Sequence, residues 1–410
     1  MDRFLGIDTL MKFNNVLTSG DFELLYNTTL AYRESQDLDI DGFVWADAQS
    51  DFDYEMFETS DDIEVMATYV DLNSPALPSG KQTEFAKLRG SIPRQKYRIV
   101  RGENDYRKEL KILDEVQNVA RLNGRNVSND IRNHLQKYLF TLLKDIPDAH
   151  KNSLNYQVGQ MKSVGALEIT AENNPRGLKG MKFSAKVPTE NTLTFKWLTK
   201  DSTTGKYTAV EGADPINDLS TQIRAIRRSG KYRNIRIELD EDYAYELLRI
   251  PSVLEQIGYA EFPNLRLSKD NGKNAVAVAN AMNEDARKDY FRRLIGADEI
   301  KYHNTIVATE KLNAESKMFD HPQMKAFNED VILIRPTGAI GKILNVAPLR
   351  PDGSAITAGI FGGRGIIEYI YNPQTRTQDW QSELTVLAVP NRPKDMFYIK
   401  GVEVTTSATE

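Results

Sequence analysis

Apolar and polar residues alternate in two stretches of the chain that flank a turn, between residues 62 and 103. The first stretch reads DIEVMATYV, and the returning stretch, QKYRIVRG, puts Tyr97 and Ile99 on one face with Lys96 and Arg98 on the other. Between them, NSPALPSGKQ has the Pro, Ser and Gly content of a turn. This pattern predicts a long β-hairpin over residues 61–103. A two-stranded ribbon is marginal in water, so the hairpin needs a surface to lie on.

The apolar period changes to threes and fours over residues 104–143, which predicts a helix. Its stripe consists of Leu110, Leu113, Val116, Ala120, Val127, Ile131, Leu135, Tyr138 and Leu142. A straight helix of this length would extend about 55–60 Å at ~1.5 Å per residue. The stretch NGRN at 123–126 leaves two shorter helices as the alternative, because glycine costs roughly 1 kcal/mol inside a helix. A single stripe on one long helix indicates that it lies across a sheet.

Strand-like segments follow Pro147, and an α/β alternation follows them. GALEITA, MKFSAKV and TLTFKWLT are the strand-like segments, and the polar loop at 199–214 is the best internal boundary. Over 215–310, helices and strands alternate, with Asp240 and Asn283 placed to cap helices, which is typical of a compact α/β unit. EDVILIRP, KILNVA, GIIEYIYN and LTVLAV add late strands. The predicted fold class is therefore α+β.

Composition describes an ordinary water-soluble protein. Hydrophobic residues make up 40% of the 410 residues and charged residues 27%, and cysteine is absent. Disulfides, thiolate metal sites and thiol nucleophiles are excluded. We find neither an apolar run long enough to span a bilayer nor a signal-peptide core, which favours a protein made and used inside a cell, without a membrane.

Charge is divided between two adjoining segments, although the whole chain is near neutral at −5. Thirteen acidic residues and no Lys or Arg lie between Glu34 and Gly80, whereas ten basic and four acidic residues lie between Lys81 and Lys111. A run of one sign gains from an oppositely charged surface nearby, in the same chain or in another copy. Two solvated faces are the alternative. The acidic segment also contains recurring aromatic residues, a composition that orders against a partner.

Candidate chemistry is sparse. Asp37, Asp39 and Asp41 open like a calcium loop ahead of Gly42, but Ala48 stands where the completing acid belongs, so they are weak metal candidates beside a solvated acidic arm. The glycine cluster at 362–365 precedes a strand rather than a helix, which predicts a turn and not a phosphate cradle. The four histidines lack metal-ligand spacing, and no catalytic motif is present. We expect no catalytic residues, no cofactor and a protein that is not an enzyme.

Arginines and lysines gather at residues 224–236, where they could meet phosphates. The cluster consists of Arg224, Arg227, Arg228, Lys231, Arg233 and Arg236. Tyr232 is its one aromatic residue, and the chain's pI of 5.7 is not that of a nucleic-acid coat, so a solvated helix end is the favoured interpretation.

The order of these elements (arm, hairpin, long helix, sheet, α/β unit, late strands) resembles the tailed-bacteriophage major capsid fold of the Hong Kong 97 type, over residues 60–400. The stretches TYVDLNSPALPSGKQTEF and IPRQKYRI resemble that family's extended loop, and NDYRKELKILDEVQNVARL resembles the start of its spine helix. The stretch DYFRRLIGADEIKYHNTIV is similar to part of its axial domain. The resemblance implies an arm at 1–60, an extended loop at 61–103 and a peripheral domain with the spine helix at 104–200. It also implies an axial domain at 201–370 and closing strands at 371–410.

The same resemblance implies a function and partners. The chain would be a major capsid protein that self-assembles as hexamers and pentamers into an icosahedral head shell around double-stranded DNA, without sequence-specific binding. Portal, scaffold and decoration or head-tail proteins would be its other partners, and the virion capsid, assembled in the host cytoplasm, its location. The expected intersubunit contacts lie in the acidic arm and the basic loop: Asp51, Asp53, Glu55, Lys81, Phe85, Lys87, Arg89, Arg94, Lys96, Tyr97, Arg98 and Arg101.

Two alternatives of different classes remain open. One is an encapsulin-like compartment with protein cargo. The other is a soluble α/β enzyme in residues 200–400 that carries an assembly arm. Closed shells in the electron microscope would support the first two interpretations, and a small oligomer with turnover would support the third.

Overall fold

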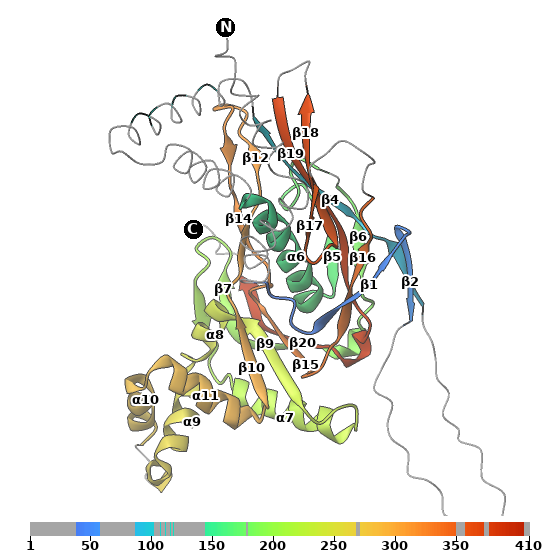
Figure 1. Ribbon diagram of the computed structural model, residues 1–410. Coiled ribbons are helices and arrows are strands. Elements are labelled where there is room, and N and C mark those ends of the chain that lie inside the picture. The colour runs from blue at the N-terminus through green and yellow to red at the C-terminus, as the bar shows by residue number, and fades with distance from the viewer. Residues whose placement is uncertain are drawn as a thin grey trace, which may run out of the picture.

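The structure is a computed structural model, and it describes residues 38–57, 87–101, 144–177, 179–267, 271–349, 357–372 and 377–405, together with Arg107, Lys111, Glu115 and Asn118. The described part contains helices and two six-stranded sheets with several two-stranded ribbons, which confirms the predicted α+β class. Figure 1 shows two lobes, one around each large sheet.

The first sheet is mainly antiparallel and follows the strand order β1-β16-β19-β18-β17, with β4 also paired to β19. Its strands are β1 (Phe43–Gln49), β4 (Arg94–Arg101), β16 (Gly341–Val346), β17 (Thr357–Ile360), β18 (Gly365–Asn372) and β19 (Thr377–Pro390). Strand β1 pairs with β16 in parallel, so a segment from near the amino terminus closes one edge of a sheet built from late strands. The predicted late strands KILNVA, GIIEYIYN and LTVLAV are all present.

Helix α6 (Asp145–Ser163) lies on the first sheet, over β19 and β4 (Figure 1). The sequence pattern did not predict it, because strand-like segments were expected directly after Pro147. Its buried apolar residues, Ile146, Leu154, Val158 and Met161, are mixed with many buried polar residues, so its apolar stripe is weak. The helix expected at 104–143 lies outside the described residues, except for four of its polar positions. These four, Arg107, Lys111, Glu115 and Asn118, are helical and exposed.

The second sheet follows the order β10-β9-β15-β20-β7-β8. Its strands are β7 (Thr192–Asp201), β8 (Tyr207–Ala209), β9 (Ile235–Asp240), β10 (Glu299–His303), β15 (Val331–Pro336) and β20 (Phe397–Thr405). Residues on both sides of the predicted boundary at 200 therefore share one sheet, and β20 joins it from the carboxyl-terminal segment. The five-segment division of the chain remains a prediction.

Helices pack on one face of the second sheet and on one another, with α10 and η2 lying against α9: α7 (Pro215–Arg228), α8 (Glu241–Leu247), α9 (Pro251–Glu261), η2 (Pro263–Leu267), α10 (Asn271–Ala281) and α11 (Glu284–Ile295). The predicted caps are confirmed. The Asp240 carboxylate accepts backbone hydrogen bonds at the start of α8, and the Asn283 side chain accepts one at the start of α11. The helical segment after Asp240 consists of two helices, α8 and α9. It is split at Pro251, because proline disfavours the helical conformation of Ile250 and suits the first turn of a new helix.

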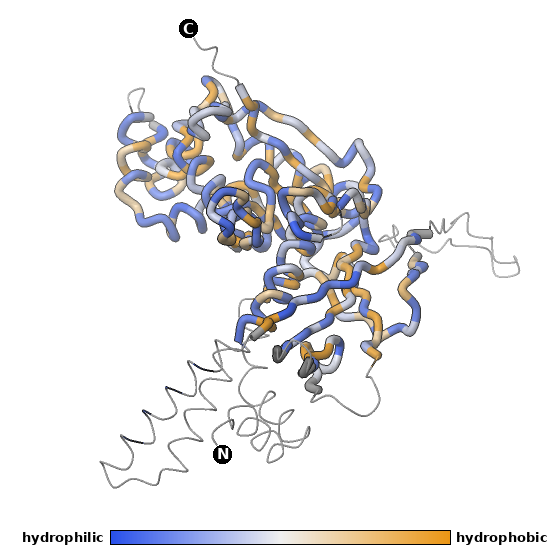
Figure 2. The backbone as a smooth tube through the Cα atoms, turned by 90° about the horizontal axis from the view of Figure 1, so that it is seen from above, coloured by the Kyte–Doolittle hydropathy of each residue, from blue (hydrophilic) through white to orange (hydrophobic). Residues whose placement is uncertain are grey.

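The second sheet is a wall shared by two hydrophobic cores. Along β15, Val331 and Leu333 belong to the core of the first lobe, whereas Ile332 and Ile334 belong to the core of the second lobe. The period of two places successive side chains on opposite faces. Figure 2 shows hydrophobic segments gathered inside both lobes. A strand between two cores needs apolar side chains on both faces. Strand β15 has them at every position before Arg335 and Pro336.

A short two-stranded stem forms the base of a projecting segment beside β1. Strand β2 (Asp53–Phe57) pairs antiparallel with β3 (Lys87–Ser91), and neither pairs with any other described strand. Tyr97 and Ile99 of the expected returning arm lie in β4, which pairs with β19 in the first sheet. The stretch expected to pair with that arm lies outside the described residues, so the hairpin pairing stays a prediction. The predicted sidedness of the returning arm is confirmed, since Tyr97 and Ile99 are half-buried while Lys96 and Arg98 are exposed. The turn expected at 73–82 lies outside the described residues.

Smaller elements complete the fold. β5 (Ala166–Glu168) pairs with β6 (Lys182–Ser184), and η1 (Thr189–Asn191) and η3 (Pro393–Asp395) are single 3₁₀ turns. A ribbon beside α6 consists of β11 (Ile306–Ala308), β12 (Lys311–Leu312), β13 (Phe319–Asp320) and β14 (Gln323–Lys325). The glycine cluster forms the predicted turn before β18, with positive φ at Gly362 and Gly363. Among the described helices, none is both long and apolar enough to cross a membrane.

Candidate functional site

Charged side chains cover the face of the second sheet that meets α6. Along β9, Ile237 and Leu239 enter the second core, so Arg236 and Glu238 must face the other way. Neighbouring strands add Lys301, His303 and Arg335. The carboxyl-terminal turn of α6 and the amino-terminal segment 38–42 close over this face. We call the resulting cluster the junction network: Asp39, Asp41, Lys162, Arg236, Glu238, Lys301, His303 and Arg335.

Glu238 is at the centre of the junction network. Its side chain is fully buried, and so is that of Lys162, whose Nζ lies 3.1 Å from Glu238 Oε2. The guanidinium of Arg335, also fully buried, donates from Nε to Glu238 Oε1 at 2.6 Å. Arg335 Nη1 donates to the carbonyl oxygens of Pro336 and Gly338. A buried carboxylate is costly unless it is paired and hydrogen-bonded, and Glu238 is both.

His303 connects Glu238 to the amino-terminal segment. Its Nε2 lies 2.8 Å from Glu238 Oε2 and its Nδ1 lies 2.9 Å from Asp39 Oδ2, while its ring stacks on Phe327 at 4.5 Å. Asp39 also pairs with Lys301. One imidazole therefore contacts carboxylates from two distant parts of the chain.

The amino-terminal segment is held by backbone as well as by charge. Asn155 Oδ1 accepts a hydrogen bond from the Asp39 backbone N–H at 2.9 Å. Asp41 pairs with Arg236 at 2.6 Å, and Gly42 turns with a φ of +84° directly beside the Arg335 guanidinium. Phe43 then enters the first core at 5% exposure. These contacts bind residues 38–43 to their own chain.

Two carboxylates of the junction network, Glu238 and Asp39, have lowered pKa values. Burial would raise the pKa of Glu238, but Lys162, His303 and Arg335 outweigh it and hold that pKa well below its usual range. Burial likewise opposes ionisation of Asp39, and the hydrogen bond from His303 with the charges of Lys162 and Lys301 lowers its pKa. Burial lowers the pKa of Lys162, although Glu238 and Asp39 act in the opposite direction.

This chemistry suits a structural lock better than a catalytic or metal site. A carboxylate whose pKa is lowered cannot serve as a general acid near neutral pH. The described residues contain no group of three His, Asp or Glu side chains that could hold a metal ion. Two of the weak metal candidates, Asp39 and Asp41, form ion pairs with Lys301 and Arg236. Asp37 lies outside the described residues.

Sequence reasoning missed the junction network. Its signal was present: charged residues alternate with Ile and Leu in IRIELD, and again in EIKYH. Such alternation normally indicates a solvated face. Only the covering helix α6 and the segment 38–43 turn this face into a buried one.

Several predicted intersubunit residues pair within the chain. Arg89 donates to Glu55 across the β2–β3 stem at 2.9 Å, at 70% side-chain exposure for Arg89. Arg94 and Lys96 both approach Glu383. Arg98 pairs with Asp379, and Asp51 and Asp53 are exposed. Lys81 and Phe85 lie outside the described residues, as do the side chains of Lys87 and Arg101. The intersubunit role of this set remains a prediction.

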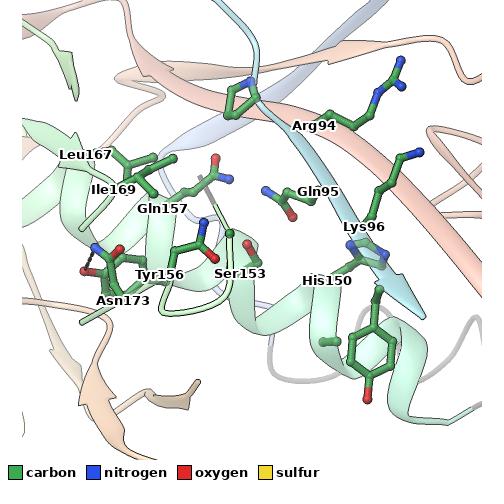
Figure 3. A pocket seen from close by; sticks show the side chains of 15 residues that line it. Arg94, Gln95, Lys96, His150, Ser153, Tyr156, Gln157, Leu167, Ile169 and Asn173 are labelled. Carbon is green, nitrogen blue, oxygen red and sulfur yellow. Dashed lines mark hydrogen bonds between the residues drawn. The ribbon is translucent and has the colours of Figure 1, made fainter. Parts of the chain in front are cut away.

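A cavity of about 530 Å³ opens between α6, β4 and the loop at 173–177. Figure 3 shows the side chain of Gln95 projecting into it near Gln157 and Ser153. Both polar atoms of the Gln95 amide are buried without a hydrogen-bond partner among the described residues. His150 lines the same cavity and bonds Ser382 at 2.8 Å. The lining therefore mixes polar and apolar side chains.

The chain is similar to several solved structures. No protein-family model matches the chain, and no curated protein matches it. Among solved structures, it is similar to a phage-related protein from Bordetella bronchiseptica, with 12% identity, a TM-score of 0.44, and coverage of 92% of this chain and 96% of that chain. It is also similar to a chain of the satellite phage P4 procapsid, with 10% identity, a TM-score of 0.44, and coverage of 98% and 99%. A chain of the mature capsid of bacteriophage PhiM1 is similar at 10% identity and a TM-score of 0.38, with coverage of 89% and 86%. These TM-scores are low, so the description of the fold rests on the helices and strands of this chain.

Proposed function

We propose that this chain is a major capsid protein that self-assembles into the icosahedral head shell of a tailed phage, around double-stranded DNA. The β2–β3 stem carries this proposal. Its two strands pair only with each other among the described strands, and residues 58–86 lie between them. A two-stranded ribbon by itself is only marginally stable in water. A neighbouring subunit supplies the surface it lacks.

The order of the elements around this stem supports the same proposal. The stem precedes a helix that lies across an antiparallel sheet, then an α/β lobe, then strands that return to both sheets. This is the order in which the extended loop, spine helix, axial domain and closing strands follow one another in the resembled family. The spine helix expected at 104–143 stays a prediction, because that segment lies outside the described residues apart from four helical positions.

The proposed assembly works by many weak contacts. An exposed ion pair contributes only ~0.2–1 kcal/mol, so the acidic arm and basic loop set register and orientation between subunits. In a closed symmetric shell the same weak contact is repeated at every equivalent subunit interface. We propose hexamers and pentamers of this chain as the building units, with a portal, a separate scaffold and decoration or head-tail proteins as further partners. Assembly takes place in the host cytoplasm.

Electron microscopy of the purified chain, alone and coexpressed with a scaffold, tests the proposal. We expect closed or tubular shells built from hexamers, and sedimentation as particles rather than as a monomer. A stable monomer or small oligomer that turns over a substrate would contradict it. Shells that package a protein and lack a portal would instead indicate an encapsulin-like compartment.

A further inference from the structure

Six basic residues and no acidic residue lie between Asp218 and Glu238. The structure gives two of the six a carboxylate partner: Arg227 pairs with Asp298, and Arg236 belongs to the junction network. The other four form no ion pair with any described residue. We call these four the α7 basic patch: Arg224, Arg228, Lys231 and Arg233.

The patch lies at the carboxyl-terminal end of α7. The apolar side chains of this helix are buried in the second core, whereas Arg224 and Arg228 lie one turn apart on its exposed side. Beyond the helix, Gly230 turns the chain with a φ of +74°, and Arg227 Nε donates to the carbonyl oxygen of Arg233 at 3.1 Å. The loop therefore returns to the helix end, at the lower edge of the second lobe in Figure 1.

Uncharged groups hold the lysine of the patch. Lys231 Nζ donates to the carbonyl oxygen of Lys394 at 3.2 Å and lies 4.9 Å from the centre of the Phe397 ring. These contacts fix the position of the ammonium group, but neither of them supplies a negative charge. The α7 basic patch therefore presents four positive charges at one end of the lobe.

Helix α11 of the same lobe treats its cations differently. Lys288 lies 2.7 Å from Glu284, and Arg292 and Arg293 both pair with Asp289. On α7, the residues three and four positions from the two exposed arginines include no carboxylate. Like charges four residues apart destabilise a helix, so an anionic partner would relieve a repulsion that α7 retains by itself.

We propose that the α7 basic patch binds the phosphate backbone of the enclosed double-stranded DNA, without reading its sequence. This inference rests on the proposed function. A guanidinium group matches phosphate through paired hydrogen bonds, and three of the four cations are arginines. Neutralising phosphates releases counterions whatever the base sequence, so a patch of charges alone is sufficient.

The surroundings of the patch favour DNA over a protein partner. Protein interfaces are anchored by apolar and aromatic side chains, and no large exposed hydrophobic side chain lies within the described residues 215–236. Tyr232, the aromatic residue of this stretch, is buried and donates its hydroxyl hydrogen bond to the carbonyl oxygen of Asp395. The net charge of −5 on the whole chain disfavours contact with DNA elsewhere, so the patch would decide which side of the subunit meets it.

The salt dependence of DNA binding tests the proposal. A labelled duplex of about 20 base pairs is titrated with the unassembled full chain, and binding is followed by fluorescence anisotropy over a series of salt concentrations. Each phosphate contact contributes roughly −0.9 to the slope of log K against log salt, so four contacts give about −3.6. The triple variant Arg224→Gln, Arg228→Gln and Arg233→Gln should make this slope shallower by about 2.7. The corresponding triple change to Lys keeps the charges and should keep most of the slope.

A matched control separates the patch from net charge. Arg176→Gln, Lys182→Gln and Lys196→Gln together also remove three exposed positive charges, but each of these residues already has a carboxylate partner. The control should leave the salt slope within about one unit of the native value. Circular dichroism checks that both triple variants remain folded, as expected for exposed side chains.

Three outcomes would overturn the proposal. They are the absence of duplex binding at low salt, an equal change of slope in the patch and control variants, and patch-dependent binding of an acidic peptide in place of the duplex. The peptide probe is residues 43–57 of this chain, which carry four carboxylates. The third outcome would assign the patch to contact between copies.

Failure of this inference differs from failure of the proposed function. Shells in the electron microscope without patch-dependent DNA binding would overturn the role of the patch alone. A small oligomer that binds the duplex through the patch would overturn the capsid proposal and leave a DNA-binding surface.

Discussion

Lys162 and Glu238, both fully buried, lie 3.1 Å apart and join helix α6 to strand β9. This contact connects the first lobe to the second at the sheet that both cores share. Taking two charges out of water is costly, and their attraction offsets that cost only with good geometry and further hydrogen bonds. Arg335 and His303 provide those bonds to Glu238. The pair therefore fixes how the two lobes meet rather than adding much net stability.

Removing one partner should be far more harmful than removing an exposed ion pair. We expect Lys162→Met to lower the free energy of unfolding by about 3 kcal/mol, because Glu238 loses a cation that it cannot replace with water. Urea unfolding followed by circular dichroism measures this change. Lys182→Met removes the exposed pair with Glu168 and should cost less than about 1 kcal/mol. Equal losses in the two variants would contradict the role assigned to Lys162.

Acid should weaken the fold through His150. Burial lowers the pKa of His150 from 6.5 to about 4. Between these values the unfolded chain binds a proton that the native chain does not, so stability falls as the pH drops from about 6.5 to 4. The slope is about 1.4 kcal/mol per pH unit, for a total of about 3 kcal/mol. His150→Gln should flatten this part of the stability profile, while the exposed His321→Gln should leave it intact. A profile that His150→Gln leaves unchanged would show that another group is responsible.

The turn at Gly42 should reject any side chain. Its φ is +84°, and a Cβ there would stand 3.1 Å from the Arg335 guanidinium carbon. Gly180 has a similar φ of +82°, with no atom within 4 Å of its Cβ position. Gly180→Ala should cost about 1–2 kcal/mol from backbone strain alone, and Gly42→Ala should cost more. Thermal unfolding of the two variants isolates the contact with Arg335, and equal costs would show that this contact is unimportant.

The stem pair Arg89–Glu55 can separate contacts within a subunit from contacts between subunits. Arg89→Glu should change the free energy of unfolding by less than about 1 kcal/mol, because the pair is exposed. We expect it to reduce the yield of shells in electron microscopy and sedimentation. Adding Glu55→Arg restores the pair within the stem. If shell yield stays low in the double variant, Arg89 acts on another copy; full recovery would show that only the stem pair matters.

Local signals in the sequence predicted the elements that depend on nearby residues. The α/β alternation, the caps Asp240 and Asn283 and the strands β5, β7, β15 and β18 followed from period, capping chemistry and turn residues. The alternation of Tyr97 and Ile99 with Lys96 and Arg98 was also correct. Each of these is set by a few neighbouring residues, whose preferences can be read without knowing what they contact.

Helix α6, the pairing of β4 and the junction network required the tertiary structure. Helix α6 buries polar residues such as Asn155 and Lys162, whose partners come from Asp39 and Glu238 far along the chain. Strand β4 has the alternation of a ribbon arm, yet it pairs with β19 almost three hundred residues later. The sequence alone determined most of the helices, strands and turns outside α6. Partner choice depends on distant residues meeting in space, and on which charged face becomes covered, so only the folded chain decided it.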